Sequence, residues 1–231
     1  MNLSSAFFSI EQLVEYCYLI GMHVEARGLS ELANCQDLFS TIENSYSEKE
    51  IFTSKSWEEY SNSMSFSEFP TGLMPAENYS YLSFLAFELP SNAKILEVGT
   101  LLGRSTLALC EGSLRNNAMI TCIDAYMGFQ QANTNVHTGQ PLNREYNYWQ
   151  TNVRAHSRRL NSIRGSATSA LRELAMRGEK YDLIFLDASH SVETFLELSY
   201  ISLLANEGCT FVADDIVNWS TDVNSDIMIS A

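Results

Sequence analysis

The chain has 231 residues, of which 45 % are hydrophobic, and a formal net charge of -14. This composition is enough for a full core in one domain with an extension, and it excludes bulk disorder. The negative field repels phosphate backbones and anionic lipid, so we expect no nucleic-acid partner and no membrane partner, although many merely soluble proteins are equally acidic.

Cysteine usage and the N-terminal segment bear on the compartment. The five cysteines are odd in number and include no Cys-x-x-Cys pair, which argues against a disulfide framework or a thiolate zinc site. The first residues carry Glu11 and Glu15 and no basic segment, unlike a signal peptide. No apolar run reaches the roughly 18 residues that a bilayer span needs. We therefore expect a reduced, cytoplasmic protein.

The chain divides into two predicted units. Residues 1–70 are expected to form an acidic, helical cap or extension, joined by a Ser-, Pro- and Gly-rich linker to a domain at 71–231. In this domain short apolar runs alternate with helical patterns, which predicts an α/β fold, a mainly parallel sheet with helices on both faces. The expected order is helix 76–89, strand 94–99, helix from 106, strand 119–124, polar insertion 127–144, helix 145–160, strand 163–166, helix 169–177, strand 181–187, helix 192–204 and strand 209–214.

A glycine turn follows the first predicted strand. Gly99 permits a sharp turn, and Gly103 lets a ligand or a strand approach the start of the next helix. Ser105 and Thr106 can cap that helix, whose free amides favour a carboxylate or phosphate. Glu97, just before the turn, is expected to hold loop amides. The spacing alone is also compatible with a plain strand-to-helix turn.

Acidic residues end three further strands. Asp124 ends the second strand, where a carboxylate can accept the hydroxyls of a ribose, or can simply be a polar strand end. Asp187 ends the fourth strand, and Asp214 and Asp215 end the fifth. Because the carboxyl ends of parallel strands share one edge, these three acids predict a site for Mg²⁺ or a similar cation. The alternative is that Asp187 and Asp214 hold loop amides and only Asp215 faces solvent.

His190 is the candidate general base, because the pKa range of histidine suits removal of a proton from an activated hydroxyl. The alternative is a histidine at a helix start with Ser189 or Ser191 as the cap. Residues 127–148 are polar with interleaved aromatics, which is typical of a binding lid but also of a surface insertion without function.

Together these motifs resemble the class I methyltransferases that use S-adenosylmethionine (SAM). Glu97, Gly99, Gly103 and Ser105 match the first motif of that family, Glu-x-Gly-x-x-x-Gly-x-Ser. The Asp-x-x-His that ends in His190 is similar to the macrocin O-methyltransferase and cephalosporin-hydroxylase-like group, whereas the catechol O-methyltransferase-like enzymes have a lysine there. The resemblance covers roughly residues 70–216 and implies a Rossmann-like fold.

The resemblance also implies an activity and a set of site residues. It implies O-methyl transfer to a hydroxyl of a small molecule, a sugar or phenolic metabolite of the kind made in natural-product biosynthesis. His190 and Asp187 would be catalytic, and Asp187, Asp214 and Asp215 would hold a divalent metal ion such as magnesium. The implied SAM-binding residues are Glu97, Gly99, Thr100, Gly103, Ser105, Asp124, Ala125, Tyr126, Ser166, Ala167 and Asp187.

One departure from the family pattern leaves other functions open. The family adds a helix and two more strands after the fifth strand, and we expect those C-terminal strands to be absent here, either naturally or by truncation, since only residues 214–231 follow Ala213. The sheet edge would then be completed by a second copy, a partner chain or the N-terminal segment. The alternatives are a SAM-binding module that is non-catalytic or partner-dependent, and a metal-independent methyltransferase. A nucleotide-binding oxidoreductase is disfavoured, because the dinucleotide glycine pattern is absent.

Overall fold

The computed structural model describes most of the second predicted unit. The described residues are 76–126, 143–188 and 193–214, with Arg27, Glu59, Tyr60, Phe69, Pro70 and Met74. The cap, the linker and their boundary at residue 70 therefore lie almost entirely outside the described residues and stay predictions. Residues 127–142 of the insertion and residues 215–231 also lie outside them.

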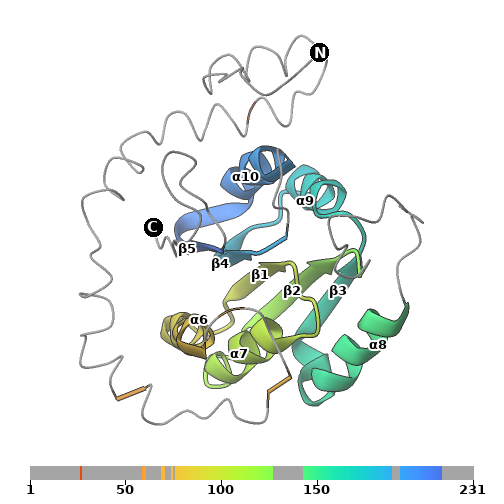
Figure 1. The fold of residues 1–231 in the computed structure, drawn as a ribbon. Helices are drawn as coiled ribbons and strands as arrows, with labels where there is room; N and C mark the ends of the chain where they lie inside the picture. Colours follow the sequence, from red (N-terminus) through yellow and green to blue (C-terminus); the bar gives the residue numbers. More distant parts are fainter. Residues whose placement is uncertain are drawn as a thin grey trace, which may run out of the picture.

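A five-stranded parallel sheet forms the centre of the domain, with the strand order β3-β2-β1-β4-β5 (Figure 1). The chain runs outward from β1 to β3 and then crosses back to β4 and β5. The order therefore reverses between β1 and β4, which is where ligands bind in open α/β sheets. The strands are β1 (Lys94–Val98), β2 (Met119–Asp124), β3 (Leu160–Arg164), β4 (Tyr181–Leu186) and β5 (Ala205–Ala213).

Helices cover both faces of the sheet, which confirms the predicted Rossmann-like architecture (Figure 1). Ile95 of β1 packs under the first helical layer and its neighbour Leu96 under the second, and both are fully buried. Burial on both faces is the physical reason that the central strands are continuous apolar runs. The first layer holds α6 (Ala76–Glu88), α7 (Arg104–Gly112) and α8 (Asn143–Asn152), and the second holds α9 (Ala167–Met176) and α10 (Glu193–Leu204).

Helices α6 and α7 run parallel to each other, and both begin at the carboxyl edge of the sheet. Tyr79 contacts Arg104 near the two helix starts, and Phe87 contacts Arg115 near the two ends. Between them the helices pack closely, because a Cβ on Gly112 would lie 2.0 Å from the carbonyl oxygen of Ser83. The start of α6 is thereby held beside the glycine turn that precedes α7.

The segment before β3 differs from its prediction. The expected helix 145–160 ends at Asn152 and is followed by a 3-10 helix, η1 (Arg154–Arg159). Strand β3 begins at Leu160 instead of residue 163. As an edge strand it has two consecutive polar residues, Asn161 and Ser162, between apolar Leu160 and Ile163, so it lacks the continuous apolar run by which the central strands were predicted.

Strand β5 also begins earlier than predicted, at Ala205 instead of residue 209. The Asn-Glu-Gly sequence there is typical of a turn, but a register shift between Tyr181 and Leu183 takes it into the strand. Asn206 Nδ2 donates to Asp182 Oδ1 across the irregularity at 2.7 Å.

Within the described part of the chain, no helix is long and apolar enough to cross a membrane.

Candidate functional site

Gly99 and Asp187 bring the ends of β1 and β4 together at the point where the strand order reverses. The Asp187 amide donates to the Val98 carbonyl at 2.7 Å. Gly99 has a φ of +92°, and a Cβ there would lie 1.7 Å from the Asp187 carbonyl oxygen. Both the backbone conformation and the lack of space therefore require glycine. The predicted cofactor turn thus directly contacts the residue predicted to serve both catalysis and metal binding.

Asp124 holds the glycine turn in shape. Its Oδ2 accepts hydrogen bonds from the amides of Thr100 and Leu101, each at 2.8 Å, and its Oδ1 accepts one from the Tyr126 amide at 2.6 Å. A carboxylate has about four acceptor positions, so Oδ1 keeps capacity for a further donor such as a ribose hydroxyl. The structure shows that Asp124 binds the amides of the loop. Its role in binding a ribose stays a prediction.

Glu97 does not hold loop amides, which corrects the sequence prediction. It is fully buried and accepts hydrogen bonds from the hydroxyls of Ser105 and Thr106, each at 2.6 Å, and from the thiol of Cys122 at 3.5 Å. Ser105 and Thr106 therefore do not cap α7, whose N-cap is Gly103. Burial raises the pKa of Glu97 to about 7, and the hydroxyl hydrogen bonds oppose that rise.

Helix α8 makes the close approach to Gly103 that was expected from a ligand or a strand. A Cβ on Gly103 would lie 3.0 Å from Val153 Cγ1, just beyond α8, and 3.1 Å from Trp149 Cδ1. Trp149 Nε1 donates to Thr106 Oγ1 at 3.2 Å, and Asn152 Nδ2 donates to a carbonyl in the glycine turn at 2.8 Å. The sequence analysis did not predict that Trp149, Asn152 and Val153 support the turn. The sequence feature that pointed to them was the aromatic-containing helix predicted next to the insertion.

The Tyr126 side chain supports the glycine turn. It is 1 % exposed, its hydroxyl accepts a hydrogen bond from Thr100 Oγ1 at 3.0 Å, and its ring packs edge-on against Tyr146. Burial raises the pKa of Tyr126, so the phenol stays protonated. Of the implied SAM-binding residues here, Tyr126 would therefore contact the cofactor through its main chain, beside half-buried Ala125.

The turn after β3 lies beside the end of β2. The Gly165 amide donates to the Asp124 carbonyl at 3.0 Å. Ser166 is the N-cap of α9, with its Oγ accepting from the Ser169 amide at 3.3 Å, so the helix begins at Ala167, two residues before the predicted start. Ser166 and Ala167, two of the implied SAM-binding residues, thus lie at the same sheet edge as Asp124.

Asp187 and Asp214 occupy neighbouring strand ends. They follow the paired residues Leu186 and Ala213, and the Asp214 amide donates to the Leu186 carbonyl at 2.9 Å. Among residues 76–126, 143–188 and 193–214, no group of three acidic, histidine or cysteine side chains is arranged to hold a metal ion. Asp215 and His190 lie outside the described residues, so the predicted metal triad and base stay predictions.

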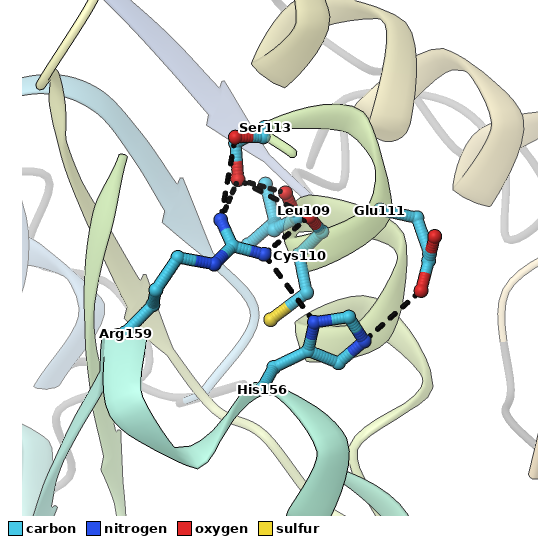
Figure 2. Close-up of polar contacts among 6 residues, drawn as sticks. All are labelled: Leu109, Cys110, Glu111, Ser113, His156 and Arg159. Atoms are coloured by element: carbon cyan, nitrogen blue, oxygen red, sulfur yellow. Dashed lines mark hydrogen bonds and ion pairs between the residues drawn. The ribbon is translucent and has the colours of Figure 1, made fainter. Parts of the chain in front are cut away.

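A second polar cluster lies at the other end of α7, away from this edge (Figure 2). The Arg159 guanidinium donates to the Cys110 carbonyl at 2.7 Å and to Ser113 Oγ at 3.0 Å, while His156 Nε2 contacts Glu111 Oε1 at 2.9 Å. A cation at the carboxyl end of a helix is favourable. The cluster ties η1 to α7, and it gives His156 a structural role.

Residues 96–216, slightly more than half of the chain, match the model of a family described as a methyltransferase domain. A search of curated proteins returned no significant match.

Three solved structures are similar to parts of this chain. Cofactor-bound Rv0187 from MTB is 23 % identical with a TM-score of 0.47, over 68 % of this chain and 62 % of that one. The O-methyltransferase from Bacillus cereus in complex with SAH is 20 % identical with a TM-score of 0.48, over 72 % and 68 %. The O-methyltransferase TomG from Streptomyces achromogenes, in complex with SAM, is 16 % identical with a TM-score of 0.49, over 70 % and 65 %. The chain thus spans less than two thirds of the first and third of these structures.

Proposed function

We propose that this chain, which belongs to the methyltransferase-domain family matched by residues 96–216, transfers a methyl group from SAM to a hydroxyl of a small molecule with the help of a divalent metal ion. The acceptor we infer is a sugar or a phenolic metabolite. One observation carries the proposal: Gly99 of the cofactor turn lies directly against Asp187, the first acid of the predicted metal and acceptor side. A donor on the turn and an acceptor beside the acids would then be neighbours.

The residues at the turn fit SAM. The glycine turn leads into the start of α7, where Gly103 as the N-cap offers no side chain to the first amides. Asp124 fixes the turn through two amides and keeps acceptor capacity for a ribose. SAM, when bound, supplies an electrophilic methyl group on its sulfonium. The protein's task is to align this methyl group with the acceptor oxygen and to exclude misaligned poses.

The acidic strand ends suit a hard cation. Asp187 and Asp214 supply carboxylates on adjacent strands, and Asp215 would supply the third. A divalent ion there would lower the pKa of a coordinated hydroxyl. His190 would take the proton from the acceptor, because a histidine has a suitable pKa near neutral pH.

The first test is a calorimetric titration of SAM into the full chain, in Mg²⁺ and then in EDTA. We expect saturable 1:1 binding, followed by methyl transfer in a panel of sugars and phenols that stops when EDTA removes the metal. Asp187→Asn should abolish transfer, whereas Asp182→Asn, at the opposite end of β4, should retain it. A chain that binds no SAM in either condition contradicts the proposal.

The same measurements separate the two alternative functions. Transfer that continues at full rate in EDTA would overturn the role of the metal and favour a metal-independent enzyme. Tight SAM binding without turnover on any acceptor would instead favour a non-catalytic or partner-dependent module.

A further inference from the structure

Arg104 lies at the start of α7 and has no counter-ion among the residues that the structure describes. It directly follows Gly103, and its guanidinium lies 4.6 Å from the centroid of the Tyr79 ring. Its Nε atom is buried and has no hydrogen-bond partner among the residues that the structure describes. No carboxylate in the described ranges forms an ion pair with it.

This arrangement is unfavourable for the protein alone. The amino end of a helix carries a partial positive charge, so a cation in the first turn is repelled. A buried N–H without an acceptor adds a desolvation cost. Two other cations of this acidic chain are paired with carboxylates, Lys94 with Glu179 and Arg177 with Glu173. An anion bound at the start of α7 would remove both penalties at Arg104.

The position of Arg104 limits which anion this is. Helices α6 and α7 both begin at the carboxyl edge of the sheet, so the Tyr79–Arg104 pair flanks the glycine turn. SAM carries one negatively charged group, the carboxylate of its methionyl moiety. We propose that the Arg104 guanidinium binds this carboxylate and makes the protein selective for cofactors that carry it. The inference rests on the proposed function, because it assigns a residue to the same cofactor site.

Decarboxylated SAM tests the assignment, because it keeps the adenosine and the sulfonium and lacks only the carboxylate. Binding of SAM and of decarboxylated SAM is measured by calorimetry for the wild type, Arg104→Met and Arg104→Lys. In Arg104→Met we expect SAM to bind about 10- to 100-fold more weakly, the usual worth of a hydrogen bond to a charged group, while the affinity for decarboxylated SAM changes less than about threefold. Arg104→Lys should restore part of the lost affinity for SAM.

Arg115→Met is the matched control. Arg115 also stacks on an aromatic ring, with its guanidinium 3.6 Å from the Phe87 centroid, but it lies near the far ends of α6 and α7. Its side chain is 54 % exposed. This variant loses the same kind of stacking and should bind both ligands as the wild type does.

Three results overturn the assignment. Equal loss of affinity for both ligands would mean that Arg104 acts only through the fold, and no loss for either would mean that it does not contact the cofactor. If Arg104→Met fails to fold, Arg104→Lys replaces it in the test. A folded Arg104→Lys whose selectivity between the two ligands is unchanged would also overturn the assignment. A wild-type chain that binds neither ligand refutes the proposed function itself. A wild-type chain that binds SAM, together with an Arg104→Met variant of normal selectivity, refutes only the role of Arg104.

Discussion

Glu97→Gln probes the buried carboxyl that supports the glycine turn. Glu97 lies under the start of α7 and accepts the hydroxyl hydrogen bonds of Ser105 and Thr106. Glutamine has nearly the same shape and stays neutral at every pH. The hydroxyls can rotate to satisfy its amide, so we expect a folded variant whose stability no longer depends on the titration of residue 97.

The magnitude follows from the pKa of Glu97. Burial raises it from the ordinary value of 4.5 to about 7. Each pKa unit is worth about 1.4 kcal/mol, so the protonated carboxyl of the folded state is favoured by roughly 3 kcal/mol. Because the folded chain holds this proton more tightly than the unfolded chain, the contribution is fully present below about pH 4.5 and is lost as the pH rises through about 7.

Urea unfolding of the wild type and Glu97→Gln between pH 5 and 8 measures this effect. We expect the variant to gain stability relative to the wild type by roughly 2 to 3 kcal/mol over that range, since other titrating groups cancel in the difference. Glu88→Gln, an exposed carboxyl at the end of α6, should show no such trend. A difference between wild type and Glu97→Gln that stays constant with pH would refute the reasoning.

Three further substitutions test the supports of the site and of α7. Gly99→Ala should destabilise the chain by more than about 2 kcal/mol in urea unfolding, because its Cβ would collide with the Asp187 carbonyl at a φ that already costs about 1–2 kcal/mol; a near-neutral result would contradict the close contact. Trp149→Phe should cost about 1 kcal/mol, because Thr106 loses its indole donor, and an unchanged melting temperature would argue against that bond. Arg159→Met should cost about 2 kcal/mol, since it uncaps the carbonyls at the end of α7, and a loss below about 0.5 kcal/mol would show that the cap is dispensable.

Much of the sheet could be predicted from the sequence, because burial on both faces leaves a local signature. The bounds of β2 were predicted without error at Met119–Asp124, and β4 was predicted within one residue. The edge strand β3 lacked this signature, and β5 contains a turn-like sequence, so both were placed incorrectly at their starts. The predicted strand starts were thus wrong where the surroundings of a strand, and not its own residues, determine its pairing.

The sequence by itself determined that a glycine turn and acidic residues follow the ends of parallel strands, since the direction of each strand and its last residue are local properties. Only the tertiary structure decided which partner each side chain takes. Asp124 holds the loop amides and Glu97 the hydroxyls, the reverse of the expectation for Glu97. Gly103 contacts Trp149, and Arg104 contacts Tyr79. These pairs are too far apart in the sequence for local hydrophobic periodicity to predict their contact. Such contacts depend on how distant helices pack on one sheet edge, and no short-range pattern encodes that packing.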